Sequence, residues 1–438
     1  MTSVTFCLHP RWIIPVEPAE TVLENTALVV KEGAIHELLP SDEARQKYAM
    51  FEHITLPTHV LFPGFVNTHG HSAMALLRGI ADDLALMEWL NEHIWPAEKK
   101  HVSDDFVFDG SLLAMSEMLR GGTTTINDMY FHHEAVARAG LAAHMRTVVG
   151  CSILEFPTPY AANAQEYISK AIHAHEQFKG EALIRFTLAP HAPYTVSDET
   201  FQRVTQLAEE LDCGIHCHLH ETLHEVEESV QQYGVRPLER LQKLGFLSER
   251  LIAAHGVHLN EHEIEVLARH RVSVAHNPTS NLKLASGIAP ITALRAMNVN
   301  VGIGTDSAAS NNKLDMLAEA RLSALLAKVQ ANQPKAIPAM EALEMATLGG
   351  AKALKLDHLI GSLKAGKRAD LVAIDFSELT TQPCFDPISQ LIYAADRSQI
   401  THVWVDGKAV VDQKNVISID QHEVRAKTAW WHQKIIAN

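Results

Sequence analysis

The stretch LFPGFVNTHGH, from Leu61 to His71, is a short apolar run that ends in a polar turn carrying two histidines. His69 and His71 are separated by one residue, and in extended backbone residues i and i+2 point to the same side. Both imidazole rings can therefore reach one point in space. Histidine is a common metal ligand near neutral pH, and its neutral ring nitrogen suits zinc or iron. Because the chain contains 27 histidines, this pair predicts a metal site only if further ligands lie at matching positions.

The composition of the chain is that of a globular protein, with 438 residues of which 47% are hydrophobic. This length accommodates a barrel of about 250 residues together with a smaller domain. The net charge of −15 argues against a nucleic-acid partner, because phosphate backbones bind to basic surfaces. The five scattered cysteines are typical of reduced thiols, which predicts a cytoplasmic protein. We expect no signal peptide and no membrane span, since no apolar run approaches ~18 residues.

From Leu61 onward, apolar runs alternate with amphipathic stretches, one of which (226–244) predicts a single long helix. Strands that alternate with helices predict parallel pairing through right-handed crossovers, and eight such units predict a (β/α)8 TIM-type barrel. An open doubly wound sheet is the alternative, but its dinucleotide-binding form requires a GxGxxG turn that does not follow the first run. The eight apolar runs are 61–66, 123–126, 145–149, 183–189, 214–219, 251–254, 272–275 and 299–303.

Both ends of the chain are rich in predicted strands. Residues 1–60 contain short alternating or apolar runs, and after the eighth barrel unit residues 371–374, 391–393 and 402–405 show the same pattern. Because neither piece is long enough to bury a core alone, we expect both to combine in one small β-sandwich domain beside the barrel. The expected organisation is 1–60 and 361–438 for this composite domain, with a terminal helix near 421–436, and 61–360 for the barrel.

Polar side chains stand at most of the predicted strand ends. The active sites of such barrels lie where strands end and βα loops begin. Polar groups are costly in a barrel core, so this placement predicts a functional site rather than packing. The residues are His69 and His71 after strand one, His191 after strand four, His216, His218, His220 and Glu221 in or after strand five, His255 after strand six, His276 and Asn277 after strand seven, and Asp306 after strand eight.

These residues include a ligand set for one metal ion. His69, His71, one strand-five histidine and Asp306 would supply three imidazoles and a carboxylate, which suit zinc or ferrous iron. A remaining coordination position would hold a water whose pKa falls towards ~7. Asp306 can accept a proton from that water, His255 can orient it, and Glu221 can act as a proton shuttle. The set predicts hydrolysis of an amide or of an amine on an aromatic ring.

Two other zinc patterns fit the sequence less well. The residues His220 to His224 match HExxH, but that protease motif requires both histidines within a helix, and residues 213–219 alternate as a strand. The zinc deaminases of nucleobases carry a PCxxC motif, which the chain lacks, and Cys213 and Cys217 precede the strand end.

The motifs PGFVNTHGH and GSLKAGKRADLV, with the HxH–H–H–D order along the barrel, resemble the amidohydrolase superfamily over nearly the whole chain. MEWLNEHIWPAEK, TLAPHAPYTVSDE, IHCHLHET, AHNPTSNLKLASGIAPI and GIGTDSAASNNKLDM further resemble the 5′-methylthioadenosine/S-adenosylhomocysteine deaminases. This resemblance implies hydrolytic deamination of the adenine ring of these nucleosides, or of adenosine, to an inosine-type product and ammonia. The alternatives are a guanine, cytosine or s-triazine aminohydrolase of the same superfamily and a non-catalytic relative, of a kind that typically loses metal ligands.

The resemblance also implies a cofactor and partners. One divalent ion would be held by His69, His71, His218 and Asp306. Zinc is the expected ion, and iron and manganese are the alternatives. The partner would be a small nucleoside rather than a nucleic acid or membrane, and a homodimer or homotetramer is compatible with the family.

Roles in catalysis and substrate binding follow from the same resemblance. Glu221 would protonate ring nitrogen N1, His255 would lie near the attacking water, and Asp306 would take its proton. The substrate contacts would be Glu98 with the ribose hydroxyls, His191 and Glu221 with the nucleoside, Arg146 with the homocysteine carboxylate, and Trp89 as an apolar wall.

Overall fold

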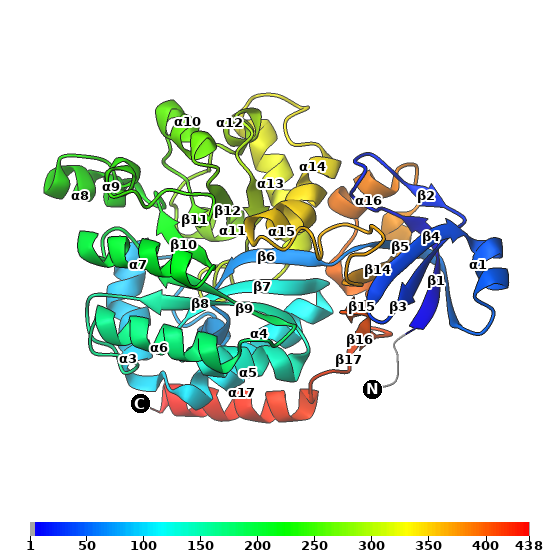
Figure 1. Cartoon of the computed structure of the whole chain (residues 1–438), viewed down its shortest axis with the longest axis horizontal. Helices are drawn as coiled ribbons and strands as arrows, with labels where there is room; N and C mark the ends of the chain where they lie inside the picture. Colours follow the sequence, from blue (N-terminus) through cyan, green and yellow to red (C-terminus); the bar gives the residue numbers. More distant parts are fainter. Residues whose placement is uncertain (1–4, 438) are drawn as a thin grey trace.

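The computed structural model describes residues 5–437 and contains a barrel of eight parallel strands surrounded by helices (Figure 1). The predicted (β/α)8 fold is thereby confirmed. The barrel closes between its first and last strands, where the N–H of Asp306 donates to the carbonyl of His69 over 2.9 Å. The side chain of Asn67 adds hydrogen bonds to Thr305 at this seam. The strands are β6 (Phe65–Gly70), β7 (Thr123–Tyr130), β8 (Arg146–Ile153), β9 (Ile184–Pro190), β10 (Gly214–Leu219), β11 (Leu251–His255), β12 (Ser273–His276) and β13 (Val301–Ile303).

Helices follow most barrel strands and cover the outside of the barrel (Figure 1). Several begin at side chains that accept a hydrogen bond from the first turn, among them Ser103, Asn163 and Ser197. The expected single helix at 226–244 is wrong, because Gly234 adopts a φ of 72° that ends the first helix and Pro237 begins a second. The outer helices are α4 (Asp104–Arg120), α5 (His133–Ala143), α6 (Ala164–Gln177), α7 (Asp198–Glu210), α8 (Leu223–Tyr233), α9 (Pro237–Lys243), α10 (Glu261–Arg269), α12 (Ile291–Ala296) and α13 (Met316–Gln330).

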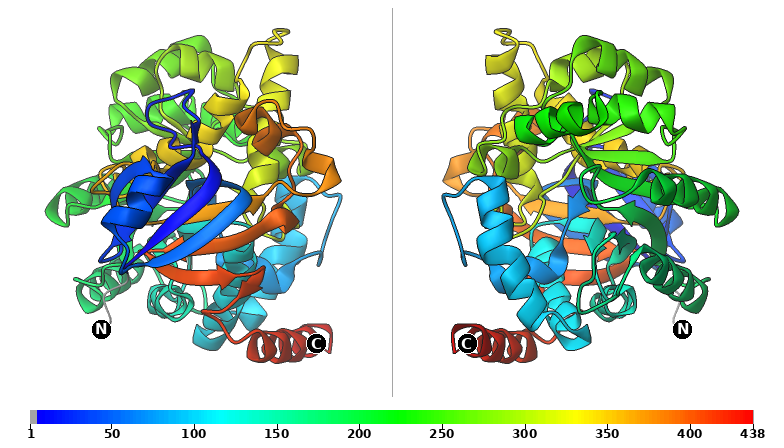
Figure 2. Two further views of the ribbon diagram at one scale, coloured as in Figure 1. Left: turned by 90° about the vertical axis from the view of Figure 1, so that its right-hand side faces the viewer. Right: turned by 90° about the vertical axis from the view of Figure 1, so that its left-hand side faces the viewer.

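A second sheet combines strands from both ends of the chain, as the sequence predicts. Its centre is an antiparallel pair in which Leu61 of β5 faces Ala373 of β14, and β5 also pairs in parallel with β1. The left view of Figure 2 shows the N-terminal strands beside the C-terminal ones. The strands are β1 (Thr5–Ile13), β2 (Leu23–Glu24), β3 (Thr26–Lys31), β4 (Ala34–Pro40), β5 (Glu52–Pro63), β14 (Leu371–Asp375), β15 (Ile400–Val405), β16 (Lys408–Asp412) and β17 (Asn415–Val416), with α1 (Ser41–Lys47) at the edge.

The run 61–66, expected to be the first barrel strand, is divided between the two sheets. Residues up to Pro63 belong to β5, and the barrel strand begins at Phe65. Gly64 lies between them, and a Cβ atom there would stand 2.1 Å from Oγ1 of Thr124, so only glycine fits. One residue without a side chain therefore lets the chain pass from the second sheet into the barrel.

One of the other elements expected from the sequence is wrong. Residues 391–393 are not a strand but the end of α16 (Pro387–Tyr393), which begins at Pro387 with Asp386 as its N-cap.

The terminal helix α17 (Gln421–Ile436) packs on the barrel, where Nε1 of Trp431 donates to Asp109 of α4 over 2.9 Å. No helix within residues 5–437 is both long and apolar enough to cross a membrane. The segment that leads into β14 contains α14 (Ala339–Glu344), a π-helical turn (Met345–Gly349) and α15 (Gly350–Ala353).

Candidate metal centre and active site

Four side chains converge at the carboxyl ends of three barrel strands. His69 is the penultimate residue of β6 and His71 directly follows that strand. His218 lies near the end of β10, and Asp306 follows β13. Oδ1 of Asp306 lies 3.4 Å from Nε2 of His69 and 3.3 Å from Nε2 of His71. Nε2 of His218 lies 3.4 Å from Nε2 of His71. Four-coordinate zinc with ligand bonds of about 2.0–2.2 Å requires donor atoms roughly 3.3–3.6 Å apart, so these distances fit one tetrahedral ion.

The other ring nitrogens of these histidines are also positioned for metal binding. Nδ1 of His71 donates to the carbonyl of Met129 over 2.6 Å, and Nδ1 of His218 donates to the carbonyl of His191 over 2.7 Å. Because a carbonyl only accepts, both rings carry a hydrogen on Nδ1, which leaves Nε2 as the nitrogen that can bind a metal. Nδ1 of His69 contacts Nε2 of His216 at 2.9 Å, and Nε2 of His69 is buried without a hydrogen-bond partner in the described chain. The donor set therefore fits a metal ion.

The electrostatics of the four groups agree with this assignment. Burial lowers the pKa of His69 to about 4 and that of His218 well below its usual value, so both rings are neutral at pH 7. Although burial raises it, the neighbouring imidazoles of His69 and His71 hold the pKa of Asp306 well below its usual range. Burial lowers the pKa of His71, but Asp306 outweighs this and raises it to about 8. Binding of a dication at this site therefore requires His71 to release a proton.

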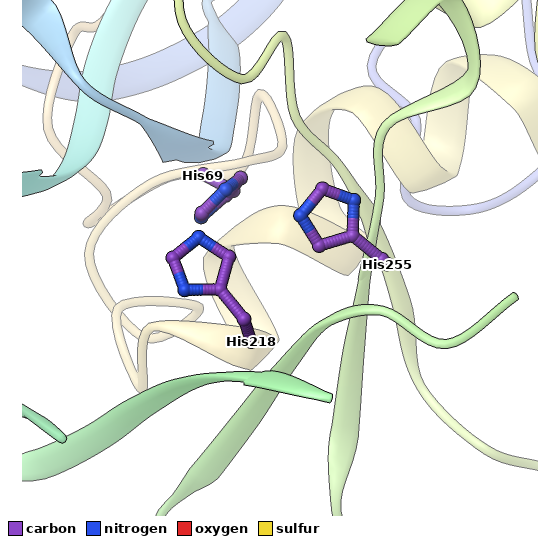
Figure 3. Close-up of side chains that lie close together, drawn as sticks. All are labelled: His69, His218 and His255. Carbon is purple, nitrogen blue, oxygen red and sulfur yellow. The ribbon is translucent and has the colours of Figure 1, made fainter. Parts of the chain in front are cut away.

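His255 lies beside the cluster, and its ring faces those of His69 and His218 (Figure 3). Its Nδ1 contacts Oδ1 of Asn281 at 2.8 Å, and its Nε2 lies 3.7 Å from Oε2 of Glu221. The backbone of His255 has a φ of 75°, a left-handed conformation that is rare outside glycine. Such strained residues concentrate at functional sites, where the surrounding structure holds them.

Glu221 lies two residues after the end of β10, and His220 between them has a left-handed φ of 55°. Its side chain is buried, and burial raises the pKa of its carboxyl group above the usual value. The HExxH pattern is not a protease motif here, because the helix begins only at Leu223 and His224 is exposed. His220 points away from the metal site, since its Nδ1 contacts the carbonyl of His258 and its Nε2 accepts the N–H of Leu238.

A cavity of about 620 Å³ opens over the metal ligands and is large enough for a nucleoside. The expected substrate residues Trp89, Glu98 and His191 line it together with Glu221 and His255. Glu98 belongs to α3 (Trp95–His101), which continues from a short α2 (Leu86–Glu88) through a π-helical turn (Trp89–Ile94). The apolar part of the wall comes from Leu86, Leu90, Ile94, Trp95, Val102, Leu154 and Phe156.

Arg146 does not reach this cavity. It is the first residue of β8 and lies at the opposite end of the barrel from the metal ligands. Its guanidinium is 3% exposed and donates to both carboxylate oxygens of Asp370, over 3.0 and 3.1 Å. The expected contact with a homocysteine carboxylate is therefore wrong, because Arg146 already pairs with a carboxylate that joins the barrel to the second sheet.

Sequence reasoning also missed residues that hold the site together. The hydroxyl of Tyr130 donates to Oε1 of Glu98 over 2.7 Å, and that of Ser280 donates to Oδ2 of Asp306 over 2.6 Å. Tyr130 is the last residue of β7, so its place at a strand end is a signal that the sequence offers. Ser280 and Asn281 lie in α11 (Pro278–Lys283), and nothing local indicates which neighbours they contact.

The model of the amidohydrolase family matches residues 60–410. This chain belongs to the amidohydrolase family. Among its relatives, a protein of Saccharophagus degradans named 5-methylthioadenosine/S-adenosylhomocysteine deaminase is 44% identical over 436 residues, covering 100% of this chain and 98% of the relative. A protein of the same name from Thermodesulfovibrio yellowstonii is 42% identical, with 98% and 99% covered. The family resemblance seen in the sequence is thereby confirmed.

Solved structures support the same family. A zinc-bound adenosine deaminase from Xanthomonas campestris superposes with a TM-score of 0.97 at 46% identity, covering 99% of both chains. The guanine deaminase of E. coli has a TM-score of 0.82 at 27% identity, covering 95% of this chain and all of the other. An atrazine chlorohydrolase of Arthrobacter aurescens, with a TM-score of 0.91 at 23% identity over 98% and 100% of the two chains, shares the fold.

Proposed function

We propose that this protein is a metal-dependent deaminase that removes the C6 amino group of 5′-methylthioadenosine and S-adenosylhomocysteine. The observation that carries the proposal is the placement of a third carboxylate, Glu98, in the same cavity as Glu221 and the four-donor centre that includes Asp306. A carboxylate accepts the hydrogen bonds that a ribose diol donates. The names of the relatives from Saccharophagus and Thermodesulfovibrio and the bound zinc of the Xanthomonas adenosine deaminase support it.

The chemistry requires a nucleophile and controlled proton transfer. When bound, a divalent cation such as zinc lowers the pKa of a coordinated water towards ~7 and so supplies hydroxide at neutral pH. Asp306 accepts the proton of the attacking water and passes it towards the leaving ammonia. Glu221 delivers a proton to ring nitrogen N1, and its raised pKa keeps that proton available. His255, whose Nε2 lies 3.7 Å from Oε2 of Glu221, orients the water.

The remaining cavity residues bind and orient the nucleoside. Glu98 accepts hydrogen bonds from the ribose hydroxyls, and the hydroxyl of Tyr130 holds one of its oxygens in place. His191 lines the cavity with its Nδ1 at 3.0 Å from the hydroxyl of Thr195. Trp89 and the apolar wall exclude water from the reacting groups, which strengthens electrostatic interactions inside the cavity.

A test separates this function from its alternatives. Zinc-loaded enzyme is mixed with methylthioadenosine, adenosylhomocysteine, adenosine, guanine, cytosine and an amino-substituted s-triazine, and ammonia release is followed with loss of the adenine absorbance. We expect turnover of the adenine nucleosides. Turnover of guanine, cytosine or an s-triazine alone would replace the proposal with another aminohydrolase. Absence of both bound metal and activity after metal addition would favour a non-catalytic relative.

Location and assembly are proposed on the same basis. A small-molecule nucleoside substrate and reduced thiols agree with a cytoplasmic enzyme, and all five cysteines are free. A homodimer or homotetramer is the proposed assembly, which light scattering of the purified protein tests.

A further inference from the structure

Glu225, a buried acid in the first turn of α8, contacts the backbone that carries Glu221. Its side chain is 4% exposed. Oε1 accepts the backbone N–H of His220 over 3.0 Å, and Oε2 accepts that of Glu221 over 2.8 Å. Its own N–H donates to the hydroxyl of Thr222, the N-cap residue, over 3.2 Å. One carboxylate therefore holds two consecutive peptide groups at the point where β10 ends.

The conformation of this turn explains why a carboxylate is needed. His220 has a φ of 55°, a left-handed conformation that is unfavourable for a residue with a side chain. Consecutive N–H groups around such a residue form a concave site that attracts an anion. Without an acceptor, both N–H groups would be buried and unsatisfied, which is unfavourable. Glu225 fills this site and so stabilises the strained turn. Burial raises the pKa of Glu225 to about 8, and the hydrogen bonds from the N–H groups of His220 and Glu221 act in the opposite direction and favour the ionised form.

The direction of the Glu221 side chain depends on that turn. The nearest basic group to its carboxylate is Nε2 of His255 at 3.7 Å, which is longer than a hydrogen bond. The backbone at residues 220–221 therefore decides where the carboxyl group points in the cavity. A displacement of about 1 Å in a catalytic group can cost about 100-fold in rate. Glu225 acts on the reacting group through this backbone and does not itself line the cavity.

We propose that Glu225 is a positioning residue that aims the proton-donating carboxyl of Glu221 at the substrate, an inference that rests on the proposed deaminase function. The isosteric change Glu225→Gln replaces one acceptor oxygen by an NH2 group that faces a backbone N–H. We expect kcat to fall about 10- to 100-fold with KM and zinc content nearly unchanged. Glu228→Gln, at an exposed glutamate of the same helix, is the matched control and should leave kcat within about twofold of wild type.

A double-mutant cycle distinguishes positioning from general damage to the fold. In the Glu221→Gln background, Glu225→Gln should lower the residual kcat less than about threefold, because the group that it positions is already altered. An equal fold-loss in both backgrounds would overturn the proposal. If Glu225→Gln does not fold, Glu225→Asp, whose carboxylate is one methylene too short, enters the same cycle under the same criterion.

A second measurement does not depend on activity. Amide hydrogen exchange of the zinc-loaded protein is followed in the peptide that spans residues 214–226. Glu225→Gln should accelerate exchange there and Glu228→Gln should not, whereas unchanged exchange in Glu225→Gln would count against positioning. If wild-type enzyme releases no ammonia from any nucleoside, the proposed function fails, and this measurement still decides whether Glu225 holds the turn.

Discussion

The hydroxyl of Tyr130 donates to Oε1 of Glu98 over 2.7 Å and joins the end of barrel strand β7 to helix α3 beside the cavity. Burial raises the pKa of Glu98 to about 7, and the hydrogen bond from Tyr130 acts in the opposite direction. The pair therefore decides at which pH Glu98 becomes the carboxylate that accepts ribose hydroxyls.

The first prediction concerns the pH dependence of substrate binding. Because Glu98 loses its proton as the pH rises through about 7, kcat/KM for methylthioadenosine should increase over that interval. Tyr130→Phe removes a contribution that lowers the pKa, so the midpoint should move to higher pH and KM should rise at pH 7. Steady-state kinetics across neutral pH measure both effects. A nucleoside that lacks both ribose hydroxyls is the control, and an identical shift with that substrate would contradict the assignment.

A second prediction concerns Arg146, whose ion pair with Asp370 is almost fully buried. Removing one partner leaves an uncompensated buried charge, so Arg146→Ala should lower the free energy of unfolding by about 3–5 kcal/mol. The matched control is Arg138→Ala, which breaks an exposed ion pair with Asp104 and should cost less than about 1 kcal/mol. Urea unfolding measures both. The ratio of kcat/KM for adenosylhomocysteine to kcat/KM for methylthioadenosine should stay unchanged. A selective loss of activity with adenosylhomocysteine would show that Arg146 contacts the substrate.

The third prediction concerns the metal ligands. Removing the ion with a chelator should abolish activity and lower the melting temperature, because a ligand that binds only the folded state stabilises it. His218→Ala should reproduce both effects. His224→Ala, at the exposed second histidine of the HExxH pattern, should retain zinc and activity. The measurements are zinc content by elemental analysis and thermal melting. Loss of zinc in His224→Ala would indicate that the HExxH pattern binds the metal.

The fourth prediction concerns the apolar cavity wall, where the rings of Trp95 and Phe156 meet edge to face with centroids 6.0 Å apart. An apolar wall favours a 5′-methylthio group over a 5′-hydroxyl. Phe156→Ala should therefore raise KM for methylthioadenosine about tenfold and KM for adenosine less than about threefold. Phe385→Ala, at a phenylalanine that is 92% exposed, should change neither. Equal increases for both substrates would show that Phe156 does not contact the 5′ group.

Much of the fold could be predicted because its signals are local and periodic. Eight apolar runs separated by amphipathic stretches correspond to the eight strands of the barrel. The errors arise where one residue changes the direction of the chain. Gly64 divides an apolar run between two sheets, and Pro387 begins a helix where the residues 391–393 favour a strand. At Gly64 the close approach of Thr124 decides the break, whereas at Pro387 a local helix start, with Asp386 as the N-cap, outweighs the strand propensity of the residues that follow.

The sequence by itself determined that two histidines with i, i+2 spacing stand at a strand end, because the period of extended backbone places both rings on one side. Barrel topology then brings His218 and Asp306 to the same end, since parallel strands share one carboxyl-terminal face. Only the tertiary structure decided the partners of Arg146 and Tyr130. The pairing of Arg146 with Asp370 spans 224 residues, and no local pattern records such a contact. A side chain at the first residue of a strand lies at the opposite end of the barrel from a side chain at the last residue. A small error in a predicted strand boundary is therefore enough to assign a side chain to the wrong end of the barrel.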